Sequence, residues 1–143
     1  MEASAHRIDR LRIRTRVSLP MFGVPAPCGA PESVENYIEG YIDPTELLIK
    51  RPASTFFVHV RGDSMNQDGI HPGDVLVVDQ SLQAEEGKII VAIVDGELTV
   101  KRYQRKGRCI WLVPSNTDYE PIPVRKGQDF EVWGVVTWVL HKV

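Results

Sequence analysis

The sequence has little cysteine and no long apolar run, and each shortage excludes a class of protein. Its two cysteines, Cys28 and Cys109, are too few for a disulfide framework or a cysteine-rich zinc site. The longest unbroken apolar run is Ile89–Val94, whereas a membrane-spanning helix needs about 20 such residues. No N-terminal stretch is typical of a signal peptide. We therefore expect a cytoplasmic protein with free thiols.

The chain also lacks a large excess of positive or negative charge. The formal net charge is -2, so the whole molecule is not an electrostatic nucleic-acid binder. Residues 1–28 are locally arginine-rich, which we interpret as a solvated basic tail. The four histidines include no HExxH pair, the motif of many zinc hydrolases. The sequence therefore predicts no metal ligands and no cofactor.

Residues 1–31 differ in composition from the rest of the chain. Four prolines and two glycines between Leu19 and Pro31 exclude a continuous helix there. We expect an extended, mobile N-terminal arm over 1–31 and one domain over 32–143. Two short helices are predicted next. The first follows Ser33 and places an apolar face on Val34–Tyr41, and the second starts at Asp43-Pro44.

The remainder predicts a mostly β fold with many strands. Apolar runs separated by turn residues indicate strands in these segments: Phe56–Val60, Val75–Val78, Lys88–Val94, Leu98–Gln104, Ile110–Val113 and Phe130–Leu140. Gly134 lies inside the last of them, which predicts a bulge or a close approach of another backbone.

Lys101 lies in the second strand of a predicted hairpin. A two-residue turn at Asp95-Gly96 places Ile90 opposite Lys101 and Ala92 opposite Thr99. Apolar neighbours disfavour the ammonium form and lower the pKa of a lysine, and a base works best when its pKa is near the working pH. A three-residue turn would change this register and leave Lys101 an ordinary solvated lysine.

Ser64 follows a predicted strand in the turn Arg61–Met65. Such a turn exposes the hydroxyl and gathers backbone N–H groups that can stabilise an oxyanion, and a neutral lysine can activate a serine. A structural reading, in which the turn only caps backbone donors, is the alternative. Cys28-Gly29 is a candidate substrate, because a tethered extended peptide reaches a cleft at high effective concentration. Otherwise it is a thiol in a linker.

Five motifs, taken in order, resemble the self-cleaving domain shared by LexA-type repressors and UmuD-type mutagenesis proteins. They are Gly62–Met65, Gly69–Asp79, Asp95–Lys101, Pro114–Ile122 and Val132–Val136. The resemblance runs from about Leu19 to the C-terminus. It is closest to UmuD, because the scissile bond falls at Cys28-Gly29, where LexA relatives usually have Ala-Gly. The region before that bond is also too short for the helix-turn-helix domain of a repressor.

The resemblance implies roles for individual residues. Ser64 is the nucleophile and Lys101 the general base, with backbone N–H groups of Asp63 and Ser64 as oxyanion donors. The arm is cut between Cys28 and Gly29. The implied fold is the complex β architecture also found in bacterial signal peptidase, as a homodimer. One departure is Pro27, which has no N–H to pair with the edge of the cleft and so weakens docking of the arm.

The resemblance also implies partners in the SOS response to DNA damage. RecA filaments on single-stranded DNA stimulate cleavage of the arm, in its own cleft or in that of a dimer partner. The shortened dimer then joins a UmuC-type polymerase for error-prone translesion synthesis, and the polymerase sliding clamp is a further candidate partner. Neither membrane binding nor sequence-specific DNA binding is expected.

Three other functions compete with this interpretation. The first is the regulatory domain of a LexA-like phage or plasmid repressor, which would bind a defined operator. The second is a signal peptidase, which would need a membrane anchor. The third is a non-catalytic interaction module in which Ser64 and Lys101 have no joint role.

Overall fold

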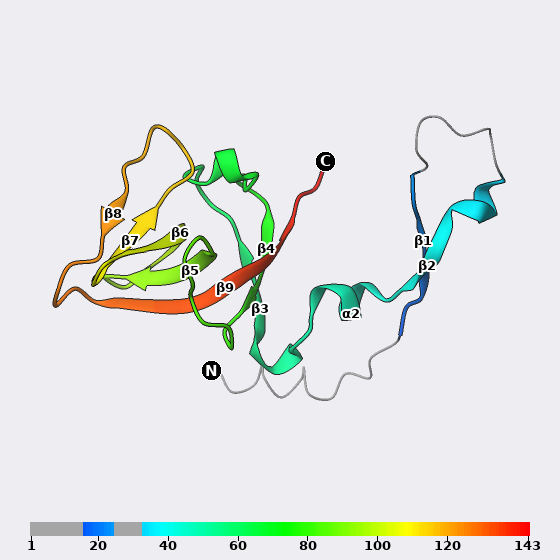
Figure 1. Ribbon diagram of the computed structural model, residues 1–143, viewed down its shortest axis with the longest axis horizontal. Helices are drawn as coiled ribbons and strands as arrows, with labels where there is room; N and C mark the ends of the chain where they lie inside the picture. Colours follow the sequence, from blue (N-terminus) through cyan, green and yellow to red (C-terminus); the bar gives the residue numbers. More distant parts are fainter. Residues whose placement is uncertain (1–15, 25–32) are drawn as a thin grey trace, which may run out of the picture. The chain divides into compact units, whose positions relative to one another are not determined.

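The computed structural model describes residues 16–24 and 33–143 (Figure 1). The chain divides into two compact units, Met1–Leu47 and Leu48–Val143. The mostly β fold is confirmed, since the described residues contain nine strands and only short helices. The predicted boundary between residues 31 and 32 stays a prediction.

The first unit contains a two-stranded antiparallel sheet. Strand β1 (Leu19–Phe22) pairs with β2 (Ile38–Ile42), and the short 3-10 helix η1 (Val34–Tyr37) precedes β2. The helix predicted over Val34–Tyr41 is therefore wrong beyond Tyr37. Burial alternates along β2, as expected for a strand with one covered face. Gly40, in addition, is a poor helix former.

The second predicted helix is confirmed as α2 (Pro44–Leu48). Its start follows from two residues. The backbone N–H of Thr45 donates to Asp43 Oδ1 at 2.9 Å, which satisfies one of the unpaired donors of the first turn. Pro44 fits the first helical position because its missing N–H would have no partner there.

The second unit is built on one seven-stranded antiparallel sheet with the order β3-β4-β9-β5-β6-β7-β8. Its strands are β3 (Thr55–His59), β4 (Val75–Asp79), β5 (Ile89–Val94), β6 (Glu97–Lys106), β7 (Cys109–Val113), β8 (Ile122–Pro123) and β9 (Phe130–Leu140). Two 3-10 helices accompany the sheet: η2 (Pro52–Ser54) precedes β3, and η3 (Asn66–Asp68) lies between β3 and β4. All six predicted strands are present. The two-residue β8 was not predicted.

Strand β9 lies between β4 and β5 and carries the predicted irregularity at Gly134. The register between β5 and β9 shifts at this point, as expected for a bulge. A Cβ added to Gly134 would lie 2.5 Å from Val78 Cγ1 and 3.3 Å from the carbonyl oxygen of Asp79. Both parts of the prediction, the bulge and the close approach, are confirmed.

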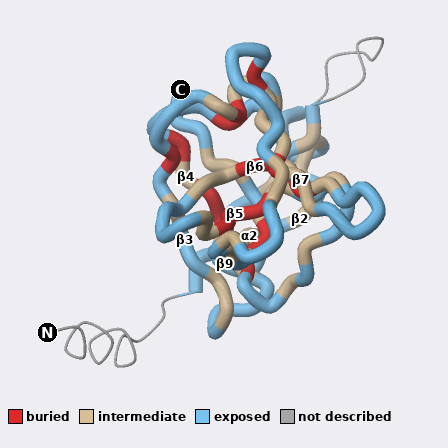
Figure 2. Tube along the Cα trace, turned by 90° about the vertical axis from the view of Figure 1, so that its left-hand side faces the viewer, coloured by how far each residue is buried: buried red, intermediate tan, exposed pale blue. Residues whose placement is uncertain are grey.

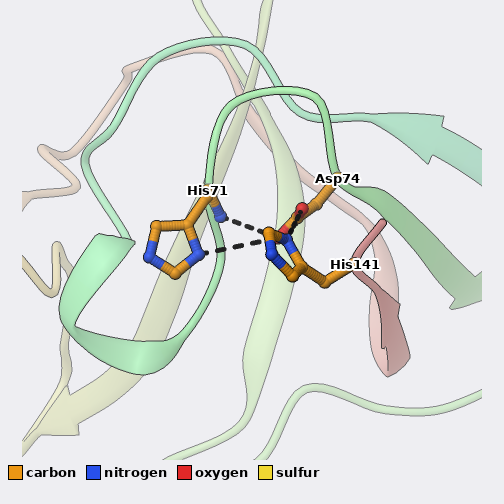
Figure 3. Close-up of side chains that lie close together, drawn as sticks. All are labelled: His71, Asp74 and His141. Carbon is orange, nitrogen blue, oxygen red and sulfur yellow. Dashed lines mark hydrogen bonds and ion pairs between the residues drawn. The ribbon is translucent and has the colours of Figure 1, made fainter. Parts of the chain in front are cut away.

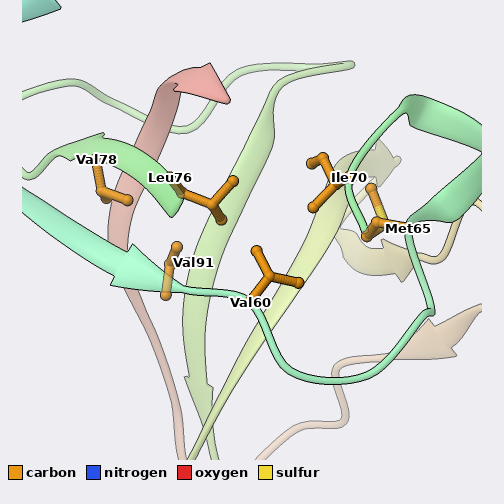
Figure 4. Packing of buried hydrophobic residues seen from close by; sticks show 6 residues of the cluster. All are labelled: Val60, Met65, Ile70, Leu76, Val78 and Val91. Atoms are coloured by element: carbon orange, nitrogen blue, oxygen red, sulfur yellow. The ribbon is translucent and has the colours of Figure 1, made fainter. Parts of the chain in front are cut away.

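Two apolar clusters form the core, with buried stretches along β4 and β5 (Figure 2). Neighbouring residues of a strand point to opposite faces, so Val91 joins one cluster and Ile90 and Ala92 the other. The cluster around Val91 is drawn in Figure 4 and comprises Val60, Met65, Ile70, Leu76, Val78 and Val91. Three of these residues, Val60, Met65 and Ile70, come from the segment between β3 and β4, which carries Ser64. The core therefore holds that loop in place.

Candidate active site

Ser64 lies in the loop between β3 and η3. Gly62 has a φ of 80°, a conformation that glycine adopts without steric cost, and it starts the turn that presents Ser64. Met65, the next residue, is only 2% exposed and packs in the core. The serine is thus fixed between a turn that only glycine suits and a buried anchor.

Lys101 lies in β6, in the register predicted from the hairpin. Asp95 and Gly96 have φ values of 50° and 84°, as expected for a two-residue type I′ turn. Ile90 pairs with Lys101, and Ala92 pairs with Thr99. The predicted register is confirmed.

The structure brings the two side chains together. Lys101 Nζ lies 3.0 Å from Ser64 Oγ, although 37 residues separate them in sequence. The same amine donates to Thr99 Oγ1 at 2.8 Å and to the carbonyl oxygen of Val100 at 3.1 Å. These two contacts aim the amine at the hydroxyl.

A groove of about 310 Å³ surrounds this contact. It lies between the chain segment that leaves β3 and the first half of β6, and its apolar lining includes Val58, Val60, Met65, Ile70 and Val91. Most of these groups belong to the core cluster of Figure 4. The cross-strand neighbours Ile90 and Ala92 do not line the groove. The apolar surroundings of the amine thus include three residues, Val60, Met65 and Ile70, of a segment that the hairpin register does not reveal.

Burial changes the chemistry of Lys101. The residue is 8% exposed, and desolvation lowers the pKa of its amine below the usual 10.5. No carboxylate is among the groups that contact the amine in the described residues. The neutral form, which is the form that can accept a proton, is therefore more populated than in a solvated lysine.

The turn also supplies backbone donors. Within the described part of the chain, the N–H groups of Asp63 and Ser64 have no hydrogen-bond acceptor. The carbonyl oxygens of the same residues are occupied. Ser64 accepts from the N–H of Ser115 at 2.8 Å, and Asp63 accepts from Asn116 Nδ2 at 2.8 Å. This pattern fixes the peptide planes and leaves the two donors available beside the groove.

Comparison with known proteins gives the family. The model of the family described as "Peptidase S24-like" matches residues 20–137. The chain belongs to the Peptidase S24-like family. The resemblance to LexA-type and UmuD-type proteins is thereby confirmed at the level of the family.

Individual relatives of this peptidase family agree with the match. Protein SamA of Salmonella typhimurium is 42% identical over 123 residues, which cover 86% of this chain and 85% of SamA. The LexA repressor of Shewanella baltica is 39% identical over 130 residues, 89% of this chain and 61% of the repressor. The LexA repressor of Acidithiobacillus ferrooxidans is 39% identical over 126 residues, 86% of this chain and 60% of the repressor.

The sequence analysis did not predict that the segment after β7 supports the turn that carries Ser64. Asn116 is 8% exposed and its amide bonds Asp63. Tyr119 donates its hydroxyl to Asp63 Oδ1 at 2.6 Å, and this bond, together with the carboxylate charge, raises the pKa of Tyr119. The motif Pro114–Ile122 was the available signal, but nothing in the sequence tied it to the Ser64 turn.

The remaining predicted site residues are Cys28 and Gly29, and they lie outside the described residues, as does Pro27. Their place relative to the groove stays a prediction. None of the helices in residues 16–24 and 33–143 has the length and apolar character needed to span a bilayer.

Proposed function

We propose that this protein cuts its own N-terminal arm at Cys28-Gly29 and is a regulatory subunit of an error-prone polymerase in the SOS response. The observation that carries the proposal is the 3.0 Å contact of Lys101 Nζ with Ser64 Oγ inside an apolar groove. Membership of a peptidase family supports hydrolytic chemistry at this contact. The geometry matches a nucleophile with its base in reach.

The first step forms an acyl-enzyme. Ser64 Oγ attacks the carbonyl carbon of Cys28 while the neutral amine of Lys101 takes the hydroxyl proton. The N–H groups of Asp63 and Ser64 hold the oxyanion that develops. The bond from Cys28 to the nitrogen of Gly29 then breaks, and the Lys101 ammonium gives its proton to the leaving amine.

The second step releases the arm. Lys101, neutral again, takes a proton from a water molecule that attacks the ester carbonyl on Ser64. The ester bond breaks, Oγ recovers its proton from Lys101, and the arm leaves with a new carboxylate at Cys28. Desolvation of Lys101 serves both steps, because each needs the amine uncharged at the start.

An extended peptide has a place to bind beside the dyad. Strand β6 pairs with β5 along Glu97–Arg102, but with β7 only from Arg102 onward. The outer edge of Leu98–Lys101 therefore has no strand partner among the described residues. Such an edge accepts an added strand. A segment rich in proline resists helix formation and is suited to this extended docking, with Pro27 removing one N–H from the pairing.

The biological assignment rests on the resemblance to UmuD-type proteins. In that role RecA filaments on single-stranded DNA stimulate cleavage, and a shortened homodimer binds a UmuC-type polymerase. We test it by passing chains over immobilised polymerase after incubation with RecA filaments. Wild-type chains are cleaved and retained, whereas intact Ser64→Ala chains are retained weakly. Equal retention of the two chains, or no cleavage with RecA, contradicts this role.

A second candidate is the regulatory domain of a LexA-like repressor, favoured by the identity of 39% to LexA repressors. A repressor binds one operator sequence far more tightly than other DNA, whereas the proposed subunit shows no such preference. Gel-shift titration against genomic fragments at fixed salt separates the two, because salt governs the nonspecific contribution. A fragment bound in strong preference to the others would favour the repressor.

A further inference from the structure

Two histidines and a buried aspartate from distant parts of the sequence converge in the second unit (Figure 3). They are His71, Asp74 and His141, and their possible ligand atoms all lie within 4.8 Å of one another. His141 Nδ1 is 2.6 Å from Asp74 Oδ1. His71 Nδ1 is 3.9 Å from Asp74 Oδ2. No step of the proposed cleavage uses these groups.

From this arrangement we propose that His71, Asp74 and His141 bind a divalent transition metal ion of the zinc type. Two imidazole nitrogens and one carboxylate oxygen form a donor set found in zinc and non-haem iron sites. Calcium and magnesium prefer oxygen ligands alone, so this set disfavours them. Two neutral imidazoles and one carboxylate leave a bound Zn²⁺ with a net charge of +1, and water fills the remaining positions.

The carboxylate of the proposed metal site is held rigidly. Asp74 is 2% exposed, and its Oδ2 accepts the backbone N–H of His71 at 2.8 Å. Its carbonyl oxygen accepts the N–H of Val60 at 2.8 Å. The ligand is therefore held in place before a metal arrives, which lowers the cost of ordering the site.

The register of the sheet brings His141 next to Asp74. Val75 of β4 pairs with Leu140 of β9, and Asp74 and His141 are the residues just outside this pair. Two neighbouring interior strands of the sheet thus set the distance between Asp74 and His141. The remaining ligand, His71, lies three residues before Asp74 in the sequence. Its carbonyl oxygen accepts the N–H of Asp74 at 3.1 Å.

Small side-chain rotations complete the coordination. Bonds of about 2.0–2.2 Å to a tetrahedral ion place ligand atoms about 3.3 Å apart. The distance from His141 Nδ1 to the Asp74 carboxylate must therefore lengthen, and the distance from His71 Nδ1 to it must shorten. The side chains of His71 and His141 are 49% and 53% exposed. Both rings can therefore turn without disturbing the core. Their centroids are already 5.6 Å apart.

The test is a calorimetric titration of the full chain with Zn²⁺, made in the Ser64→Ala background so that the chain stays intact. We expect one ion per chain, with affinity reduced at least ~10-fold in His71→Ala and in His141→Ala. Both residues are exposed, so these variants keep the fold. His59→Ala is the matched control, because His59 is an exposed histidine on β3 outside the cluster. It should bind zinc as the parent chain does.

Thiols are a second possible source of zinc binding, since Cys109 is a free exposed cysteine. The titration is therefore repeated in Cys28→Ser, Cys109→Ser chains, in which the proposed site predicts unchanged affinity. Proton NMR of the imidazole rings should show the His71 and His141 signals shift with zinc while the His59 signal stays. Absence of zinc binding, binding as tight in His71→Ala and His141→Ala as in the parent chain, or binding lost only with the thiols overturns the proposal. Each readout is independent of self-cleavage.

Discussion

The amine of Lys101 has a different chemical character from the other lysines because of where it lies. Its chain is buried, its Nζ touches two hydroxyls and one carbonyl oxygen, and the groove around it is largely apolar. An ammonium in this place loses hydration that these neutral acceptors only partly replace. Burial therefore makes the Lys101 amine a better base and lowers the stability of the folded chain.

This lowered pKa makes both cleavage and stability depend on pH. The rate of self-cleavage should rise with pH and level off at a lower pH than it would with an ordinary lysine, because the pKa of Lys101 is lowered. Between the lowered pKa and 10.5 the unfolded chain binds a proton that the native chain does not, so the free energy of unfolding rises with pH. Urea unfolding of wild type and Lys101→Met over a pH series measures this. A stability difference independent of pH argues against a desolvated amine.

Asn116 acts on Ser64 indirectly, as a positioning residue. Asn116→Ala removes the bond from Nδ2 to the carbonyl oxygen of Asp63 and loosens the turn. Since small misplacements of reacting groups cost up to about 10²-fold, we expect cleavage to slow by about 10–100-fold. Tyr119→Phe, which removes only an exposed bond to Asp63, should slow it less. The pH at which the rate levels off should not move, because Lys101 keeps its surroundings. A moved plateau contradicts a positioning role.

At the scale of single residues, the sequence predicted only part of this site. The turn Asp95-Gly96 determines the hairpin register, so Lys101 opposite Ile90 could be predicted from the sequence. The groove-lining role of Ile70 and the bond from Asn116 to Asp63 could not. They depend on where loops fold back, and no local pattern encodes that.

At the scale of elements, β9 approaches the end of β4 closely at Gly134. Gly134→Ala should lower the free energy of unfolding by about 1–3 kcal/mol, the usual cost of overpacking, because the new Cβ meets Val78 Cγ1 and the carbonyl of Asp79. Thermal or urea unfolding measures the loss. In a Val78→Ala background the added cost should be smaller, since the nearer of the two contacts is gone. Full additivity of the two substitutions would show that close approach is not the cause.

The one wrong element also has a physical cause. The apolar spacing over Val34–Tyr41 predicted a helix, although short segments such as Ile38–Ile42 can also form strands. Pairing with Leu19–Phe22 decides for the strand. A partner about 20 residues earlier lies beyond the reach of periodicity arguments. By contrast, the strands from β3 to β7 are bounded by clear turn residues, and most of them have short apolar runs, so their positions were predictable.

For the molecule as a whole, one buried carboxylate links separate segments of the second unit. Asp79, 3% exposed, accepts from Ser54 Oγ at 2.8 Å, from Ser81 Oγ at 2.7 Å and from Arg51 at 3.1 Å. Burial raises the pKa of this carboxyl, but hydrogen bonds from Ser81, Ser54 and Arg51 outweigh it and lower the pKa to about 2. The loop after β4 and the segment before β3 are thus joined at one charge.

Asp79 therefore contributes to the acid stability of the fold. Because its native pKa is depressed, its contribution is complete above the ordinary pKa of 3.8 and is lost as the pH falls towards about 2. Asp79→Ala should cost about 1–3 kcal/mol at neutral pH, since it leaves buried donors without an acceptor. Unfolding of this variant should depend less on pH between about 4 and 2 than that of wild type. The same dependence of stability on acid pH in both chains would show that Asp79 does not contribute to acid stability.

The most direct test of the account is mass spectrometry of the purified chain after incubation at alkaline pH. We predict one cut, between Cys28 and Gly29, in the wild-type chain and none in Ser64→Ala. Lys101→Ala should cleave about 10²–10⁴-fold more slowly, and Lys101→Arg should be as slow, because a guanidinium does not give up its proton. A cut at another bond, or undiminished cleavage in the Ser64→Ala or Lys101→Ala chain, would contradict self-cleavage by this pair.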